Sequence, residues 1–232
     1  PIPNAGQLNA FITVNLKEDK RIKLGFPEKI KRAHTGRDDE KYPDALDRAR
    51  ELDRYFARTG KFAGPLHGIP IAAAAAADYG DDRPPDDATM VAKLRAAGAI
   101  LLGKTNMDEY APAGIARSAF GGQTCNPYDT TRIPGGSSGG EAVAIATHMS
   151  CGGLGSDLAG SVRIPAHFCG ICGLKPTTGR VSGEGQYPPS TGPYGLGAVI
   201  GPMARTVGDL RLLFSVLSNE TYLDRDLRGL RF

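Results

Sequence analysis

The segment from Gly139 to Met149 constrains the fold most, because it is rich in small residues and apolar on nearly every side. A helix whose surface is apolar all round has to be surrounded by other elements of the protein. A loop that carries two serines among glycines, Pro134 to Glu141, leads directly into this segment. The sequence therefore predicts a helix in the middle of the molecule with a serine-bearing loop at its N-terminal end.

Helical patterns alternate with short apolar segments along the rest of the chain. We expect helices over residues 44–58, over 87–98 with Asp87 as the N-cap, and over 206–217. Short buried strands are expected over residues 68–71 and 99–102. Helices that alternate with buried strands are typical of an α/β protein with a largely parallel or mixed sheet.

Length, charge and hydropathy narrow the class of protein. The chain has 232 residues, 41% of them hydrophobic, which suits one substantial core and a single domain over residues 1–232. The formal net charge is +3, and Lys and Arg are spread among acids, so we expect a small-molecule substrate and no nucleic-acid partner. Without a long apolar run or a signal-peptide pattern, we also expect no membrane span and a cytoplasmic protein.

Two further features are expected to carry no chemistry. Residues 17–41 are dense in charge and are interpreted as an exposed insertion. Cys169 and Cys172 have the spacing of half a zinc site, but the second pair of ligands is missing from the sequence. We therefore predict no metal site and interpret the cysteines as small apolar residues.

Ser161 is the candidate nucleophile. It follows Asp157-Leu-Ala-Gly160 and precedes a segment that can start a helix, so free backbone N–H groups are expected around it. Small residues before it would let a substrate carbonyl approach these donors, as an oxyanion hole requires. A serine also needs a base. A Ser-His-Asp site is poorly supported, because the sequence has no Gly-x-Ser-x-Gly elbow and no histidine in a fixed relation to one.

The loop from Gly135 to Gly140 has two simpler interpretations. A flexible glycine-serine loop is the default for such a hexapeptide taken alone. A phosphate cradle is excluded because no Gly-Lys-Ser/Thr follows the glycines. What favours a catalytic loop is the set of motifs that surrounds it.

Those motifs, in their order, resemble the amidase signature family of serine hydrolases. They are Leu8-Asn-Ala-Phe-Ile, Pro65-Leu-His-Gly-Ile-Pro-Ile, Gly103-Lys-Thr-Asn-Met-Asp-Glu-Tyr, the stretch from Gly122 to Ser182, and Gly201-Pro-Met-Ala-Arg-Thr-Val. The family includes fatty-acid amide hydrolase, bacterial amidases and the A-type component of glutamyl-tRNA amidotransferase. The resemblance implies an amidase signature fold, a mixed β-sheet core flanked by helices on both faces, with no metal or organic cofactor.

The resemblance also implies roles for individual residues. The family uses a Ser-Ser-Lys triad, in which Ser161 matches the nucleophile and Ser137 matches the bridging serine, whose preceding peptide bond is cis in the family. The backbone of Leu158, Ala159, Gly160 and Ser161 matches the oxyanion hole. Ser138, Asp157 and Arg163 match structural supports of the loop. Ala111 lies in a segment that matches the substrate entrance, so it is expected to contact substrate.

The base lysine of the family aligns with Ala74, within a run of alanines from Ala72 to Ala77. An alanine cannot take a proton. Either the alanines stand for residues whose identity was not determined, one of them the lysine, or the chain is an inactive amidase fold. We favour the first, because Ser137, Ser161 and the glycines around them are intact. Lys104 is a tempting substitute, but the family has a lysine there in addition to the base, so a structural role is expected.

We therefore expect an amidase that hydrolyses a carboxylic amide to an acid and an amine or ammonia through an acyl-enzyme on Ser161. The alternatives are a catalytically inactive amidase-fold binding protein and the A-type component of a glutamine-dependent amidotransferase. Residues 183–194 lack the Ser-Ser-Leu-Asp-Gln segment typical of A-type components, which favours the stand-alone amidase. The resemblance covers the N-terminal half of the family's domain, so the C-terminal half is expected to be absent. A homodimer is left open.

Overall fold

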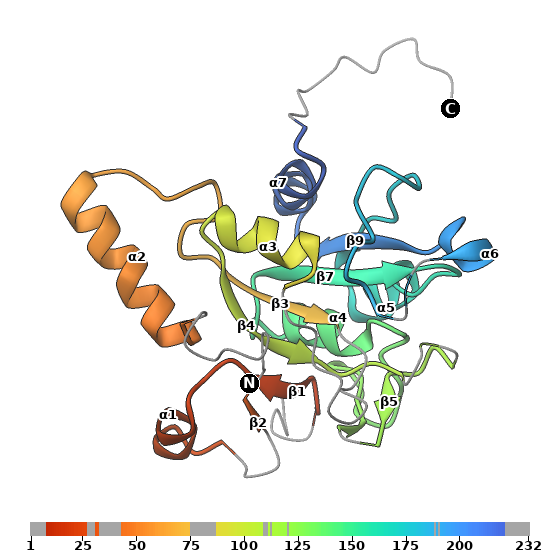
Figure 1. Cartoon of the computed structure of the whole chain (residues 1–232). Helices are drawn as coiled ribbons and strands as arrows, with labels where there is room; N and C mark the ends of the chain where they lie inside the picture. The colour runs from red at the N-terminus through yellow and green to blue at the C-terminus, as the bar shows by residue number, and fades with distance from the viewer. Residues whose placement is uncertain are drawn as a thin grey trace.

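A computed structural model describes residues 8–26, 31–32, 43–74, 87–108, 111, 113–119, 121–187, 189 and 191–220. These residues form an α/β structure built on a 7-stranded sheet with the order β2-β1-β4-β3-β7-β9-β8, and helices cover both of its faces (Figure 1). A separate two-stranded sheet pairs β5 with β6. The predicted fold class, a mixed sheet flanked by helices, is confirmed.

The strands are β1 (Phe11–Val14), β2 (Lys31–Arg32), β3 (Pro70–Ala74), β4 (Ile100–Thr105), β5 (Arg117–Ser118), β6 (Gly122–Gln123), β7 (Gly152–Asp157), β8 (Cys172–Gly173) and β9 (Val199–Ala204). The helices are α1 (Glu18–Lys23), α2 (Ala45–Thr59), α3 (Thr89–Ala96), α4 (Gly139–Ala146), α5 (Arg163–Cys169), α6 (Gly192–Gly195) and α7 (Val207–Ser218).

The central strands of the sheet are parallel, antiparallel pairs lie on either side of them, and the edge strand β2 is parallel to β1. Strand β3 runs parallel to both β4 and β7. Strand β1 is antiparallel to β4, and β9 is antiparallel to β7 and to β8. Strand β2, from the charged segment 17–41, pairs with β1 at the edge, so part of the predicted insertion extends the sheet. Residues 17–26 of that insertion are also described and include α1, whereas residues 27–30 and 33–41 lie outside the described residues.

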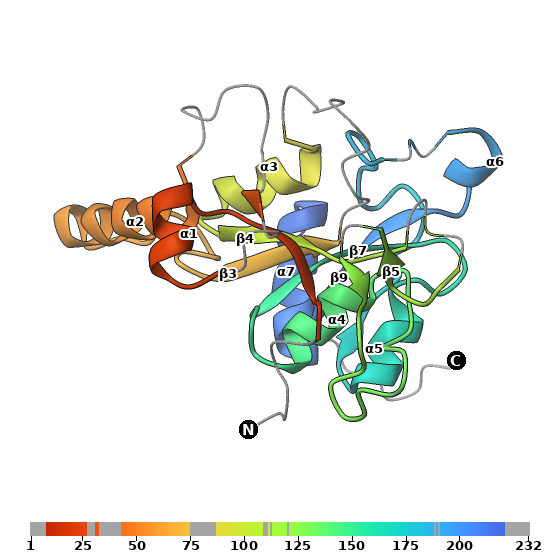
Figure 2. The same cartoon turned by 90° about the horizontal axis from the view of Figure 1, so that it is seen from below.

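The two faces of the sheet have separate cores. Helices α3 and α7 cover one face, where Ile71 and Ala73 of β3 pack with Leu154 of β7. Helices α4 and α5 cover the other face (Figure 2). The residues of α4 from Gly139 to Ile145 are all buried, which confirms the helix predicted in the middle of the molecule. Gly140 has to be a glycine, since a Cβ there would lie 2.4 Å from the carbonyl oxygen of Asn106.

Helix boundaries follow the capping signals in two cases and depart from them in one. Helix α2 begins after Asp44, whose carboxylate accepts from the N–H of Asp47, and α7 begins after Thr206, whose hydroxyl accepts from the N–H of Asp209. The predicted N-cap of α3 at Asp87 is wrong, because Ala88 occupies that position. The Asp87 carboxylate instead forms an ion pair with Arg95 at 2.6 Å.

The cysteines behave as packing residues. All four are free thiols, and burial raises the pKa of the Cys169 thiol to about 12. Within the described ranges, no three His, Cys, Asp or Glu side chains gather as metal ligands would. The same ranges contain no helix of the length and apolarity that crossing a bilayer requires.

Candidate active site

The loop that carries Ser161 is built around the buried carboxylate of Asp157, the last residue of β7. This carboxylate accepts hydrogen bonds from the N–H groups of Gly160 at 2.8 Å, Val162 at 3.1 Å and Arg163 at 3.3 Å. The Arg163 guanidinium adds two bonds, at 2.9 and 3.0 Å. The chain is thereby bent from strand β7 into helix α5, with Ser161 half-buried at the bend. Asp157 and Arg163 thus support the loop, in the role that the resemblance implies.

The electrostatics of Asp157 match this supporting role. Burial alone would raise the pKa of its carboxyl group, but the Arg163 guanidinium and the backbone N–H groups outweigh burial and hold the pKa below its ordinary value. Asp157 is therefore a fixed negative charge at neutral pH. It is a poor candidate for a group that takes a proton from Ser161.

The backbone around Ser161 offers N–H groups that a ligand could bind, but the N–H of Gly160 is not one of them. The N–H of Gly160, expected in the oxyanion hole, donates to Asp157. The N–H groups of Leu158, Ala159 and Ser161 have no acceptor among the described residues. Leu158 and Ala159 are exposed, so a ligand can approach these donors from solvent.

The glycine-serine loop lies against the Ser161 loop. The N–H of Ser138 donates to the carbonyl oxygen of Ser161 at 3.1 Å, which joins the two serine-bearing segments directly. The peptide bond between Gly136 and Ser137 is cis, as the resemblance implies. Ser137 and Ser138 are fully buried, and neither hydroxyl has a hydrogen-bond partner within the described part of the chain. Buried hydroxyls without partners are uncommon and often mark a site of function.

A third segment, residues 108–117, borders the glycine-serine loop. The Asp108 carboxylate accepts from the N–H groups of Ile115 and Arg117, which fixes the segment. The backbone of this segment packs closely on Gly136. A Cβ added to Gly136 would lie 2.6 Å from the carbonyl carbon of Gly114. Ala111, the predicted substrate contact, belongs to this segment and has a left-handed backbone with φ 64°. Part of the predicted entrance, residues 109, 110 and 112, lies outside the described residues.

Position 74 is the last residue of strand β3. Ala74 pairs in register with Thr105, and the Thr105 hydroxyl donates to Glu141 of α4 at 2.9 Å. Lys104 pairs with Ala73, whose side chain belongs to the core on the opposite face. Successive residues of a strand face opposite sides, so Lys104 points away from the serines. It does not replace a base at position 74. Residues 75–77 of the alanine run lie outside the described residues.

Glu141 is a functional candidate that the sequence analysis did not single out. It is fully buried, and only one of its carboxylate oxygens has a partner, the Thr105 hydroxyl. Burial raises the pKa of its carboxyl group from 4.5 to about 8, and the Thr105 bond offsets only part of this rise. The signal in the sequence is one acidic residue in the otherwise apolar segment 139–149.

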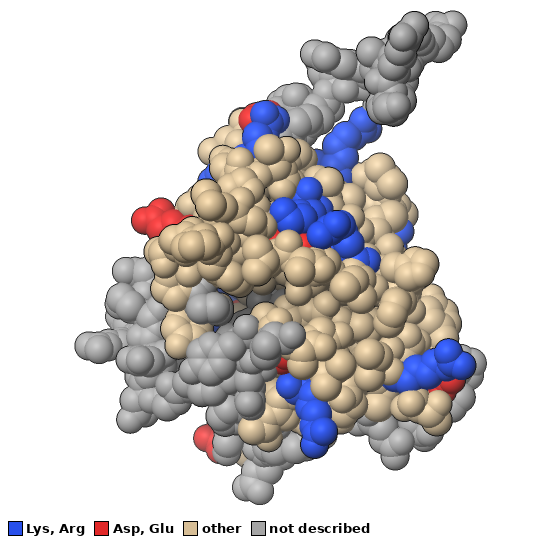
Figure 3. All heavy atoms as spheres, turned by 90° about the vertical axis from the view of Figure 1, so that its right-hand side faces the viewer, with Lys and Arg blue, Asp and Glu red and all other residues tan. Residues whose placement is uncertain are grey.

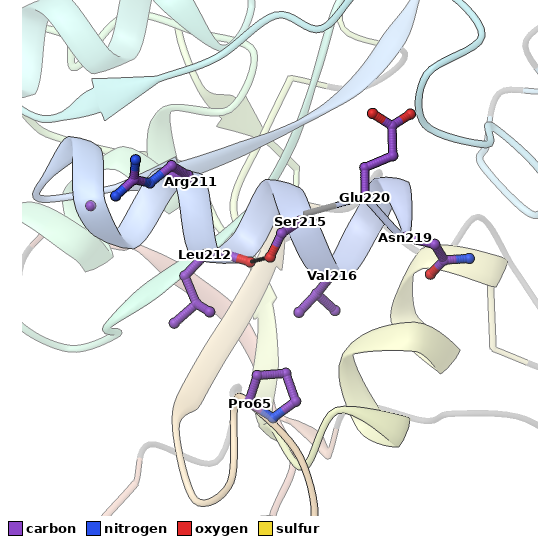
Figure 4. Close-up of a pocket in the computed structure, with 8 residues that line it drawn as sticks. Pro65, Arg211, Leu212, Ser215, Val216, Asn219 and Glu220 are labelled. Atoms are coloured by element: carbon purple, nitrogen blue, oxygen red, sulfur yellow. Dashed lines mark hydrogen bonds between the residues drawn. The ribbon is translucent and has the colours of Figure 1, made fainter. Parts of the chain in front are cut away.

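The outer surface adds little to this site. On the described part of the face shown in Figure 3, Lys and Arg form small groups separated by uncharged residues. An open hollow of about 460 Å³ lies along the outer side of α7, lined by Arg211, Leu212 and Ser215 among others (Figure 4). This hollow is lined by residues of α7, on the sheet face opposite α4, and by neither Ser137 nor Ser161.

Comparisons with known proteins place the chain in a family. Residues 28–229 match the family model described as Amidase. The A-type component of glutamyl-tRNA(Gln) amidotransferase from Natranaerobius thermophilus is 40% identical over 198 residues, which cover 78% of this chain and 38% of that protein. Its counterpart from Chloroflexus aurantiacus is 42% identical, with 82% and 44% covered. The chain thus spans less than half the length of these relatives.

Solved structures agree with the sequence relatives. The native peptide amidase from Stenotrophomonas maltophilia has a TM-score of 0.67 and 38% identity, and the match covers 81% of this chain and 40% of that one. A fatty acid amide hydrolase has a TM-score of 0.64 and 34% identity, with 74% and 32% covered. The match over most of the chain, with this level of identity, shows that the chain belongs to the amidase family.

Proposed function

We propose that the chain carries the nucleophile of an amidase, which hydrolyses a small carboxylic amide through an acyl-enzyme on Ser161. The hydrogen bond from the Ser138 N–H to the Ser161 carbonyl is the observation that carries this proposal. It holds the glycine-serine loop beside a serine that lies at a bend with free backbone donors. A nucleophile, a second hydroxyl and an oxyanion-binding backbone are the parts that acyl transfer needs.

In the proposed reaction, the Ser161 Oγ attacks the amide carbon, and a C–O bond forms as the carbonyl π electrons move to oxygen. The N–H groups of Leu158, Ala159 and Ser161 are the candidate donors to the resulting oxyanion, and losing one such donor costs about 3 kcal/mol in the transition state. The C–N bond then breaks, and the leaving nitrogen takes up the serine proton. Water hydrolyses the acyl-enzyme and restores Ser161.

The proton needs a carrier between Ser161 and the leaving nitrogen. We propose Ser137 as the bridge and position 74 as the place of the base. An alanine there lowers turnover by about 10²–10⁴-fold, which is the usual contribution of a general base. The intact mass of the purified chain tests our expectation that a lysine stands there. A mass above the 24.4 kDa of the sequence supports the expectation, and a mass equal to that value contradicts it.

Replacing the serines tests the proposed reaction. Ser161→Ala should abolish covalent labelling by a fluorophosphonate and hydrolysis of aryl and peptide amides, whereas Ser137→Ala should leave slow labelling. Ser182, an exposed serine outside the site, provides the control, and Ser182→Ala should be labelled like the unchanged protein. Labelling of Ser161→Ala at the unchanged rate would contradict the assignment.

A second candidate is the A-type component of a glutamine-dependent amidotransferase. The curated relatives from Natranaerobius thermophilus and Chloroflexus aurantiacus favour it, because both are components of this type. Ammonia release from glutamine that depends on added partner proteins would support this candidate. Hydrolysis of peptide or aryl amides by the chain alone would support the stand-alone amidase. The third candidate is an inactive binding protein. If residue 74 is an alanine, such a protein should neither release ammonia from glutamine nor hydrolyse peptide or aryl amides.

A further inference from the structure

A linking segment, residues 126–133, leads into the glycine-serine loop and connects it to the chain that follows Ser161. Asn126, at the start of this segment, is buried. Its side-chain NH₂ group donates to the carbonyl oxygen of Ile133 at 3.4 Å and to that of Phe168 at 3.1 Å. Ile133 directly precedes the glycine-serine loop, and Phe168 lies in helix α5, which begins just after Ser161. One side chain therefore joins the two serine-bearing segments at a point away from the serines themselves.

Further bonds hold the Asn126 amide in place. Its oxygen accepts from the N–H of Tyr128 at 2.9 Å, and the Asn126 N–H donates to the carbonyl oxygen of Arg132 at 2.9 Å. The Tyr128 hydroxyl donates to the carbonyl oxygen of Cys169 at 3.2 Å, next to the carbonyl of α5 that Asn126 binds. The last carbonyl groups of a helix have no partner within the helix. The side chains of Asn126 and Tyr128 supply donors to two of them at the end of α5.

The glycine-serine loop needs such an external support. Glycine fills four of the six positions from 135 to 140, and glycine loses more conformational freedom on folding than any other residue. Helix α4 holds the loop from Gly139 onward. At its other end the loop lies against α5, since a Cβ on Gly135 would lie 3.1 Å from the Cα of Pro165. The position of this end therefore depends on the bonds that tie Ile133 to α5.

We propose that Asn126 and Tyr128 are positioning residues, which hold the glycine-serine loop against the Ser161 loop. The bond from the Ser138 N–H to the Ser161 carbonyl, at 3.1 Å, is the near joint between the two loops, and the Asn126 amide is the far joint. Two joints fix the relative orientation of the loops, whereas a single hydrogen bond lets them turn about it. The consequence for catalysis rests on the proposed function, in which Ser137 carries the proton of Ser161.

Hydrogen exchange at the Ser138 amide, followed by NMR, tests this positioning without any hydrolysis. The reference is the Thr147 amide, which donates to the Val143 carbonyl at 3.0 Å at the far end of α4 and reports the stability of that helix. Asn126→Ala removes both side-chain donors of the far joint. The exchange rate of Ser138 relative to that of Thr147 should rise about 5–10-fold, the usual effect of losing one hydrogen bond. An unchanged ratio would overturn the proposal.

A second variant and a matched control sharpen the test. Tyr128→Phe removes one hydroxyl from a residue that is 74% exposed, so the variant should fold, and the ratio should rise about twofold. Asn15→Ala is the control, because Asn15 is also buried and its amide donates to the Leu101 carbonyl at 3.0 Å, away from both serine-bearing loops. The control should leave the ratio unchanged. No rise in Tyr128→Phe, or an equal rise in Asn15→Ala and Asn126→Ala, would overturn the proposal.

Fluorophosphonate labelling connects the positioning to the proposed reaction. Asn126→Ala should be labelled at Ser161 about 10–100-fold more slowly than the unchanged protein, because small displacements of reacting groups have effects of this size. Asn15→Ala should be labelled at the unchanged rate. Labelling of Asn126→Ala at the unchanged rate would overturn the positioning role. A complete lack of labelling in the unchanged protein would instead contradict the proposed function, and the exchange ratios would then decide on the positioning by themselves.

Discussion

Asp157 and Glu141 are both fully buried carboxyl groups on the same side of the sheet. Their surroundings nevertheless shift their pKa values in opposite directions. Asp157 receives three backbone N–H groups and a guanidinium, and its pKa is lowered. Glu141 receives one hydroxyl, and burial raises its pKa to about 8. Both side chains are inaccessible to solvent, but more protein surrounds Glu141, so a larger cost of burying its charge and a smaller set of donors together keep it protonated at neutral pH.

The two environments suit different tasks. A permanently charged, fully bonded carboxylate such as Asp157 holds a loop in one conformation, which is what positioning Ser161 requires. An incompletely bonded carboxyl group such as Glu141 can gain or lose a proton near neutral pH. Groups with strongly shifted pKa values gather at functional sites for this reason. The support of the Ser161 loop and the carboxyl group with the raised pKa therefore lie on two separate elements, the end of β7 and the first turn of α4.

The largest expected effect concerns the pH dependence of stability through Glu141. The Glu141 carboxyl group has a pKa of about 8 in the folded protein and an ordinary value of 4.5 when unfolded. Between these two pH values only the unfolded chain loses the proton, so the free energy of unfolding falls as pH rises. Glu141→Gln removes this loss. The free energy of unfolding of the variant, relative to the unchanged protein, should rise by roughly 4 kcal/mol between pH 4 and pH 8. Urea unfolding across this range measures the difference, and parallel pH profiles would contradict the account.

A smaller loss of unfolding free energy is expected from Asp157→Asn. This change removes the charge that pairs with Arg163 and replaces a carboxylate oxygen by an NH₂ group, which cannot accept from the backbone N–H groups. Because Arg163 is about half exposed, the loss of unfolding free energy at pH 7 should be about 2–3 kcal/mol. The loss should shrink in acid, as pH falls through the lowered pKa of Asp157. Asp129→Asn is the matched control, since Asp129 bonds Thr131 and Arg132 on the surface. A control variant as destabilised as Asp157→Asn would contradict the assigned difference.

The smallest expected effect tests the contact between the Glu141 carboxyl group and β7. Gly153→Ala would place a Cβ 1.8 Å from Glu141 Oε1 and 2.8 Å from the carbonyl oxygen of Ala72, so the carboxyl group has to move. We expect a loss of about 1–3 kcal/mol in unfolding free energy. Gly208→Ala, in α7, meets no atom closer than 3.7 Å and should be neutral or stabilising. Equal stabilities of the two variants would show that the contact is absent.

Much of this fold could be predicted from local patterns. Apolar residues on all sides of 139–149 predicted the buried helix α4, and the capping residues Asp44 and Thr206 predicted where α2 and α7 begin. The error at Asp87 has a physical cause. A capping residue was expected from its type alone, whereas Arg95 of the same helix binds the Asp87 carboxylate.

The candidate site could be predicted less completely, because its contacts join distant segments. The motifs indicated Ser161 and Ser137, but only the fold shows that Ser138 bonds Ser161 and that Lys104 lies on the other face of the sheet. The lack of a partner for Glu141 Oε1 depends on how α4 packs against β3, β4 and β7. The residue type alone does not reveal this packing. The bond between Gly160 and Asp157 likewise depends on how the loop bends.

The charge state of Glu141 tests the account most directly. A carbon-13 NMR titration of its side-chain carboxyl signal, assigned by its absence in Glu141→Gln, should show a pKa of about 8. A pKa near the ordinary 4.5 would contradict the account.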